Sequence, residues 1–235
     1  MERPNILVIL SDQHSKYQLG CYDDTLVRTP NIDRLASEGM RFTSAYTAAP
    51  LCVPARMAFM STRRPSANEV WNNAHILNSA IPTWAHAMGA TGYETALIGR
   101  MHFVGSDQRH GFERRPIGEY SAHHPGVPRL GEPMFKDIPA STSGQIRECV
   151  EIAGYGRTTY QAFDEMVAEA GVQYLRAKAA GGDRPFAAVA SFVLPHCPFF
   201  APKELYDYYY ERVDVPEPSI EDLARQPQAI KNFKK

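Results

Sequence analysis

The sequence contains no long apolar run. A helix that spans a membrane needs about 18 or more consecutive apolar residues, and no such stretch occurs in the 235 residues. Basic residues are not in excess, because 25 Lys and Arg stand against 26 Asp and Glu and give a formal net charge of −1, so nucleic acid binding lacks electrostatic support. Residues 1–4 lead directly into a strand-like run, without the apolar segment of a secretory signal. We expect neither a membrane partner nor a nucleic acid partner, and a cytoplasmic location.

Cysteine is also scarce. The four cysteines form neither a C-x-x-C pair nor a zinc-binding spacing, so the sequence indicates no disulfide framework and no zinc site. They are Cys21, Cys52, Cys149 and Cys197. What remains is an ordinary globular balance, 44% apolar and 22% charged, in a chain long enough to bury a sizeable core. Because the pattern contains neither internal repeats nor a second domain boundary, we expect residues 1–235 to form one domain.

One of these cysteines opens a short pattern that combines three chemical groups. Cys52 precedes Pro54, and proline favours the first turn of a helix, where its missing N–H costs nothing. The sequence therefore predicts a helix over residues 55–61 with Cys52 at its N-terminus, where unpaired backbone N–H groups and the helix dipole stabilise an anion. Arg56, one turn on, adds a positive charge. A buried structural cysteine is the alternative, and a cysteine-phosphatase loop is disfavoured because it needs a longer Cys-to-Arg spacing than the three residues here.

Three apolar runs are typical of parallel strands that are buried on both faces. They cover residues 5–10, 92–98 and 185–194. Polar side chains suited to ligand binding follow each run, in chain order Asp12, then Arg100 with His102, then His196. Because ligands bind at the carboxyl ends of strands in open α/β sheets, the pattern favours an α/β fold with a central, mostly parallel sheet flanked by helices. A turn-capping aspartate and core histidines are the alternatives to a binding site.

Other segments complete this picture. Apolar periodicity and capping residues predict helices over residues 30–38, 82–88 and 159–180, and residues 40–46 predict a strand. Residues 116–157 are rich in Pro, Gly, Ser and charge and show little periodicity. Because irregular segments of this length are uncommon and usually functional, we expect a lid or a substrate-selecting loop there.

Four stretches resemble the motifs of one family, in that family's order along the chain. They are residues 29–46 (TPNIDRLASEGMRFTSAY), Cys52-Val53-Pro54-Ala55-Arg56, Gly99-Arg100-Met101-His102 and Pro195-His196-Cys197-Pro198-Phe199. The second is similar to the signature of the sulfatases, the formylglycine-dependent branch of the alkaline-phosphatase-like hydrolases, whose fold is built around a large, mostly parallel sheet. The continuation of the third, residues 101–113, is most similar to the choline-sulfatase branch.

The resemblance implies a modified nucleophile and a metal ion. In sulfatases the signature cysteine, here Cys52, is oxidised to formylglycine, whose hydrated aldehyde is the nucleophile. One divalent cation is held in an oxygen-rich site, Ca²⁺ first and Mg²⁺ or Mn²⁺ as alternatives. By resemblance, Asp12, Gln13 and the modified Cys52 are its ligands. Many members carry a second aspartate where Gln13 stands, and the glutamine offers a carbonyl oxygen instead.

The resemblance also assigns roles around the nucleophile. Arg56 and His102 orient it, and His196 assists the departing alcohol. Arg100 binds the sulfate, although the family has lysine there; arginine keeps the charge but gives up a proton-transfer role. Asn73 resembles a substrate-contacting asparagine, with a turn-forming role as the alternative.

Taken together, the resemblance implies a sulfuric ester hydrolase acting on a small-molecule sulfate ester. Phosphonate or phosphate ester hydrolysis is the close alternative, and a non-catalytic sulfatase-like fragment is the second. Family members are more than twice this length, and their second pair of metal ligands would lie beyond residue 235. We therefore expect residues 1–235 to be the N-terminal portion of a catalytic domain, with a fold incomplete at its C-terminus. Further residues, a second chain or a homo-oligomer would complete the site.

Overall fold

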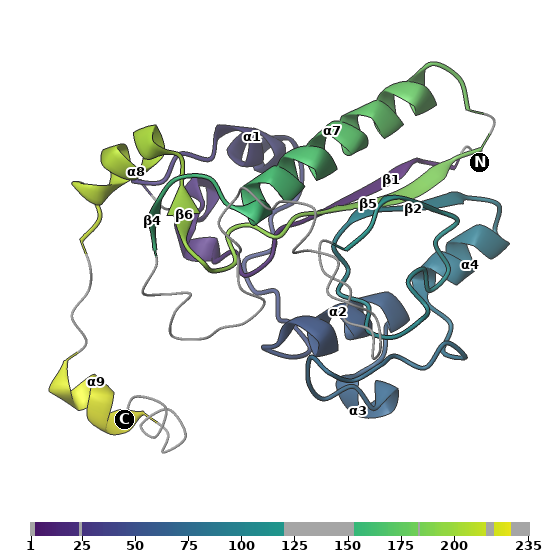
Figure 1. Ribbon diagram of the computed structural model, residues 1–235, viewed down its shortest axis with the longest axis horizontal. Helices are drawn as coiled ribbons and strands as arrows, with labels where there is room; N and C mark the ends of the chain where they lie inside the picture. Colours follow the sequence, from purple (N-terminus) through teal and green to yellow (C-terminus); the bar gives the residue numbers. More distant parts are fainter. Residues whose placement is uncertain (1–2, 24, 120–152, 183, 215–218, 227–235) are drawn as a thin grey trace.

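The computed structural model describes residues 3–23, 25–119, 153–182, 184–214 and 219–226. Its main sheet has four strands in the order β1-β5-β2-β3, and each neighbouring pair is parallel. The strands are β1 (Ile6–Leu10), β2 (Glu94–Gly99), β3 (Arg114–Ile117) and β5 (Phe186–Ser191). This arrangement confirms the expected α/β fold with a mostly parallel sheet (Figure 1).

Helices cover both faces of the central strands. Figure 1 shows α7 (Thr159–Ala179) on one side of the sheet, and α2 (Cys52–Ser61) with α4 (Trp84–Ala90) on the other. Side chains alternate between the two faces of a strand, so Leu97 of β2 packs in one core cluster with α2 and α4, whereas Ile98 packs in another with α7. Both β2 and β5 are buried along their whole length, which is typical of strands covered on both faces.

Smaller elements surround this core. They are η1 (Lys16–Gln18), η2 (Gly20–Tyr22), α1 (Pro30–Glu38), α3 (Pro65–Asn68), β4 (Gly154–Tyr155), β6 (Phe200–Ala201), α8 (Lys203–Tyr210) and α9 (Ile220–Arg225). Strands β4 and β6 form a second, two-stranded parallel sheet, and α8 lies beside it (Figure 1). Among the described residues, no helix combines the length and the apolar character that crossing a lipid bilayer requires.

The local signals for two helices are confirmed, although α4 begins and ends two residues later than the predicted residues 82–88. Thr83 precedes α4 and forms a capping box with His86: the Thr83 N–H donates to His86 Nδ1 at 3.1 Å. Helix α7 spans all but one of the residues that periodicity predicted, and Phe163, Val167 and Tyr174 of its apolar stripe are buried. Both observations fit the view that caps and an apolar face together define a helix.

Two expectations about strands were wrong. Residues 5–10 were expected to be buried on both faces, but Leu7 is 40% exposed and Ile9 62%. Leu7 and Ile9 point to the same face of β1, and among the described residues neither core cluster reaches that face, whereas Val8 and Leu10 pack on the other face. Residues 40–46 form no strand at all, and Met40 and Phe42 are exposed, because β propensity holds only where a partner strand and a packed face support it.

Two further expectations have other outcomes. Thr29 precedes α1 but makes no capping bond to it; its hydroxyl donates to Asp33 Oδ1 instead and accepts from the Gly20 N–H, both at 2.9 Å. The lid or substrate loop expected over residues 116–157 lies mostly outside the described residues, which break off between 119 and 153.

Gly99, at the end of β2, offers a test of this packing. Its φ is +96°, and an added Cβ would lie 2.3 Å from the Ser191 carbonyl oxygen of the neighbouring strand and 2.8 Å from Val167 Cγ2. We expect Gly99→Ala to lower the free energy of unfolding by about 2–4 kcal/mol, since both the backbone strain and the overlap must be relieved. Urea denaturation measures the change.

The matched control is Gly171→Ala, inside α7. An added Cβ there meets nothing within 4 Å, and alanine is favoured over glycine in a helix interior by about 1 kcal/mol. This variant should be as stable as the parent or more so. Similar losses at both glycines would show that the approach of β2 to β5 and α7 is not as close as described.

Candidate functional site

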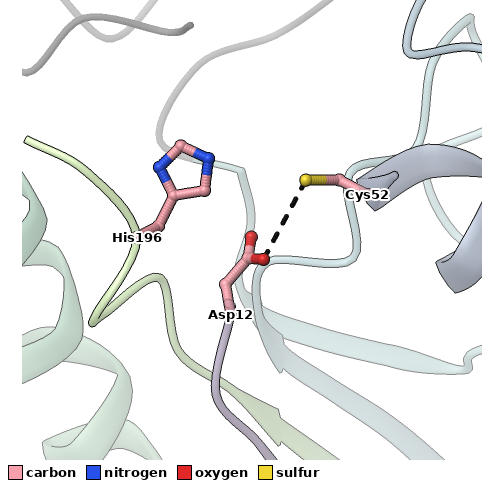
Figure 2. A group of neighbouring side chains, drawn as sticks. All are labelled: Asp12, Cys52 and His196. Carbon is pink, nitrogen blue, oxygen red and sulfur yellow. Dashed lines mark hydrogen bonds between the residues drawn. The ribbon is translucent and has the colours of Figure 1, made fainter. Parts of the chain in front are cut away.

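The carboxyl ends of three neighbouring strands converge on one point. Asp12 follows β1, Arg100 follows β2, and His196 lies in the turn after β5. Helix α2 brings Cys52 to the same edge, and Figure 2 shows the side chains of Asp12, Cys52 and His196 pointing toward one another. The ligand-type atoms of these three residues all lie within 4.8 Å of one another. Residues that are 40 and more positions apart in the sequence therefore meet where parallel sheets place their ligands.

Cys52 is the first residue of α2. The first N–H groups of a helix have no partner within the helix, and here the Val53 N–H donates to Asn73 Oδ1 at 3.0 Å. Asn73 thus supports the end of the helix from outside, a role that neither of its sequence-based interpretations included. The positive end of the helix dipole faces the Cys52 side chain.

The Cys52 thiol is held in its neutral form. Burial raises its pKa, and the nearby Asp12 carboxylate raises it further, although the positive charges of Arg100 and Arg56 oppose them. The Sγ atom donates a weak hydrogen bond to Asp12 Oδ1 at 3.9 Å (Figure 2). Because the thiolate is the reactive form of cysteine, the unmodified side chain is a poor nucleophile at neutral pH.

Arg56 connects α2 with all three strand ends. Its Nη1 donates to the Arg100 carbonyl oxygen at 2.9 Å and to Ser191 Oγ at 3.1 Å, and its Nη2 lies 3.3 Å from Asp12 Oδ2. The guanidinium group is about nine-tenths buried. The planar fork of arginine suits several acceptors at once, so this one residue fixes the helix against the sheet.

Arg100 and His102 form a second contact within the site. Arg100 Nε lies 3.7 Å from Asp12 Oδ2, and Arg100 Nη2 lies 2.8 Å from His102 Nδ1. A guanidinium group can only donate, so His102 Nδ1 is the acceptor and the ring proton sits on Nε2. The His102 backbone has φ +59°, a left-handed conformation that is uncommon outside glycine and that concentrates at functional sites.

His196 has the opposite arrangement of protons. Its Nδ1 lies 2.7 Å from the Cys197 carbonyl oxygen; a carbonyl only accepts, so Nδ1 carries the proton and Nε2 is unprotonated in the neutral ring. Burial has the largest effect on the pKa of His196 and lowers it; the hydrogen bond to the Cys197 carbonyl and the Asp12 charge raise it, the charges of Arg100 and Arg56 lower it, and the net shift of the pKa is downward. The ring is therefore neutral at pH 7.

The residues present fit a divalent cation in part. Asp12, Gln13 and Cys52 line one cavity of about 470 Å³ together with Arg56, and Asp12 Oδ2 is a buried oxygen that accepts no hydrogen bond, although two guanidinium groups lie at ion-pair distance from it. A hard cation such as Ca²⁺ takes six to eight oxygen ligands. The described residues supply one carboxylate and, from Gln13, an amide oxygen, which is a portion of such a set.

The structure thus brings most of the predicted site residues into one contact network. They are Asp12, Cys52, Arg56, Arg100, His102 and His196. Gln13 adjoins the network as a cavity residue and Asn73 through the backbone of Val53. Sequence reasoning missed Ser191, which accepts from Arg56 and is fully buried, and His14, which lines the same cavity. A hydroxyl at the end of an apolar strand was the available signal for Ser191.

Comparisons with known proteins agree with this geometry. The family model described as Sulfatase matches residues 4–230. The chain is 34% identical to choline-sulfatase of Rhizobium meliloti (strain 1021) over 88% of this chain and 41% of that protein, and 31% identical to the uncharacterized sulfatase YidJ of Escherichia coli (strain K12) over 97% and 46%. The chain therefore spans less than half the length of these relatives.

A solved structure shows the same fold at lower identity. Phosphonate monoester hydrolase of Agrobacterium radiobacter superposes with a TM-score of 0.62 and 22% identity, over 88% of this chain and 44% of that one. An identity this low speaks for the fold alone. The match over nearly the whole chain, together with the two relatives above 30% identity, is decisive: the chain belongs to the sulfatase family.

Proposed function

We propose that this chain forms the nucleophile-bearing part of a sulfuric ester hydrolase in which Cys52 is oxidised to formylglycine. The observation that carries the proposal is the position of Cys52 at the N-terminus of α2, with Asp12 and His196 within 4.8 Å. Membership of the sulfatase family supports the reaction class. Because the chain covers less than half of its relatives, activity and substrate are proposed for the protein that contains it.

The chemistry of the thiol explains why a modification is needed. A neutral, buried thiol attacks poorly, whereas the hydrate of formylglycine carries two hydroxyl groups. One hydroxyl oxygen attacks the sulfur of the ester, the bond from sulfur to the alcohol oxygen breaks, and the alcohol leaves with a proton. The second hydroxyl then loses its proton, the aldehyde reforms, and sulfate departs.

The two histidines divide the proton transfers. In the neutral ring His196 Nε2 is unprotonated, so it can take the proton of the attacking hydroxyl and pass it to the departing alcohol. His102 carries its proton on Nε2, since Nδ1 accepts from Arg100. This favours a hydrogen-bond donor role toward the hydrate over a general-base role.

Positive charge stabilises the sulfate group. Arg100 and the N-terminus of α2 are the groups that we assign to the sulfuryl oxygens, because a fixed cation and the positive end of a helix dipole favour an anion. Asn73 supports α2 through its Oδ1, and its Nδ2 is the donor that it would offer to a substrate.

A divalent cation completes the proposal, with Ca²⁺ preferred and Mg²⁺ or Mn²⁺ as alternatives. Asp12, Gln13 and the modified Cys52 would hold it, and it would supply Lewis-acid polarisation of the sulfuryl oxygens and a lower pKa of the hydrate. The remaining oxygen ligands would come from residues outside 1–235, or from a second chain. A homo-oligomer and a cytoplasmic location remain predictions from the sequence.

One observation favours a second candidate function. The two guanidinium groups beside Asp12 suit a phosphonate or phosphate ester as well as a sulfate ester, since both ester classes present a tetrahedral anion to the same cations, and the fold is shared with a phosphonate monoester hydrolase. A non-catalytic fragment that binds an anion without turnover is the remaining alternative.

The central test replaces the nucleophile. In the native protein that contains residues 1–235, Cys52→Ala should lower kcat for 4-nitrophenyl sulfate by at least about a thousandfold, because the attacking group is lost. Cys21→Ala, which removes a thiol outside the site, should keep the parent rate. Intact mass should show the defined loss that accompanies conversion of Cys52 to formylglycine.

The outcomes separate the candidates. A faster turnover of phenyl phosphonate esters than of sulfate esters would favour the second function. An unmodified Cys52 with full activity would overturn the proposed nucleophile, and an unmodified, inactive protein would favour the non-catalytic alternative.

A second test examines the thiol before oxidation. In protein produced without the modifying system and treated with EDTA, Asp12→Asn should lower the pKa of Cys52, because it removes one of the two main causes that raise it. Alkylation of Cys52 by iodoacetamide at pH 7.5 should then become about three- to tenfold faster, as followed by peptide mass spectrometry.

The control is Asp207→Asn, an exposed carboxylate paired with Lys203. It should leave the alkylation rate unchanged, and Cys52→Ala gives the background from the other cysteines. An unchanged or slower rate in Asp12→Asn would mean that the Asp12 carboxylate does not face the thiol.

A further inference from the structure

The turn that carries His102 is held by a carboxylate that the sequence did not single out. The backbone N–H groups of Met101 and His102 both donate to Glu119 Oε1, at 2.8 and 2.6 Å. The Glu119 side chain is only 6% exposed. Two consecutive amides that share one charged acceptor make short, strong hydrogen bonds, so Glu119 fixes the direction in which the chain leaves β2.

Glu119 is itself held by Arg115, which Gln108 holds in turn. Arg115 Nη2 donates to Glu119 Oε1 at 3.1 Å, and Arg115 Nη1 donates to Gln108 Oε1 at 3.0 Å. Gln108 Nε2 in turn donates to the carbonyl oxygens of Phe103 and Gly105, both at 2.9 Å. A continuous set of polar contacts therefore braces residues 101–105 around His102.

The turn that carries His196 is held in the same manner. Asp164 of α7 accepts from the N–H groups of Val193 at 2.8 Å and Leu194 at 2.9 Å, one on each carboxylate oxygen. The His196 N–H donates to the Val193 carbonyl oxygen at 3.0 Å. Asp164 is nine-tenths buried, so its two bonds set the turn that aims the His196 ring.

Both turns need such support. His102 has a left-handed backbone, which costs roughly 1–3 kcal/mol and persists only where the surroundings impose it. The tautomers of both rings depend on neighbours within these turns, Arg100 for His102 and the Cys197 carbonyl for His196. Small displacements of catalytic groups, of about 1 Å, lower rates by about two orders of magnitude.

We infer that Glu119 and Asp164 are positioning residues of the hydrolase site: Glu119 sets His102, and Asp164 sets His196. The inference rests on the proposed function for its readout and on these hydrogen bonds for its geometry. Each carboxylate acts through one histidine, and this pairing distinguishes positioning from a general contribution to stability.

Double-mutant cycles test the pairing. Asp164→Asn places an amide group against one of the two N–H donors, and it should lower kcat for 4-nitrophenyl sulfate about 10- to 100-fold. In the His196→Ala background the same change should cost less than about threefold, whereas in the His102→Ala background the full loss should remain. Glu119→Ala should show the converse pattern: its effect on kcat should disappear in the His102→Ala background and remain in the His196→Ala background.

Two readouts go beyond the size of the loss. His196 serves the departing alcohol, so Asp164→Asn should slow an alkyl sulfate, with its poor leaving group, more than 4-nitrophenyl sulfate; Glu119→Ala should slow both equally. Glu119→Gln keeps one oxygen for both N–H groups, and it should recover most of the activity that Glu119→Ala loses.

Matched controls separate positioning from folding. Glu113→Gln and Glu165→Gln remove exposed carboxylates that pair with Arg184 and Arg157, and both should keep the parent kcat. Val167→Ala removes buried side-chain volume from α7 and serves as a destabilised reference. Below its unfolding temperature this variant should keep the parent kcat, and any change that it makes in kcat should be the same factor in every background.

The outcomes decide between the two roles. The inference is overturned if Asp164→Asn or Glu119→Ala lowers kcat by the same factor in the His196→Ala and His102→Ala backgrounds. It is also overturned if either change lowers kcat no more than Val167→Ala does at equal stability. If the parent protein hydrolyses no sulfate ester, the proposed function fails. The positioning roles are then tested separately, by measuring the dissociation constant of inorganic sulfate by calorimetry for each variant of the same double-mutant cycles.

Discussion

The guanidinium group of Arg56 is the contact on which the site depends. It joins helix α2 to the ends of all three central strands, through Asp12, the Arg100 carbonyl and Ser191. Each partner is buried, and removing one side of a buried ion pair typically costs about 3–5 kcal/mol because the other charge is left without compensation. Cys52 lies one helical turn away from Arg56, so the contacts that fix α2 also fix the position of the nucleophile relative to the sheet.

The same contacts set the charge of the site. Two guanidinium groups, Arg56 and Arg100, face one carboxylate, Asp12, which leaves one positive charge in the described part. This excess favours an anionic ligand and also acts on the neighbouring groups: both arginines lower the pKa of His196 and of Cys52. For the imidazole, burial adds to the arginines and keeps the ring neutral; for the thiol, burial and Asp12 outweigh them. The same arrangement of charges thus favours binding of an anion and leaves the unmodified Cys52 as a neutral, unreactive thiol.

Sequence patterns predicted what local chemistry determines. Apolar runs followed by polar residues located the strand ends, and Pro54 located the first turn of α2, although the helix begins at Cys52 and not at residue 55 as predicted. They failed where a partner decides the outcome: β1 has an open face, and residues 40–46 form no strand, because an apolar pattern does not say whether an element exists to cover it. The bonds of Asn73 to α2 and of Asp164 to the His196 turn join residues 20 and 29 apart, and no spacing rule connects such positions.

The two histidines show why these long-range bonds matter to the chemistry. An imidazole offers either a proton or a lone pair at Nε2, and the neighbour of Nδ1 decides which. Arg100 donates to His102, and the Cys197 carbonyl accepts from His196, so one site holds a donor and an acceptor of protons at the same pH. Each tautomer depends on the path of a turn, and the lowered pKa of His196 keeps its Nε2 unprotonated. Glu119 and Asp164 accept hydrogen bonds from backbone N–H groups of the two turns and so fix their conformation. Substitutions at these carboxylates therefore change which ring nitrogen carries the proton, although neither carboxylate contacts a ring.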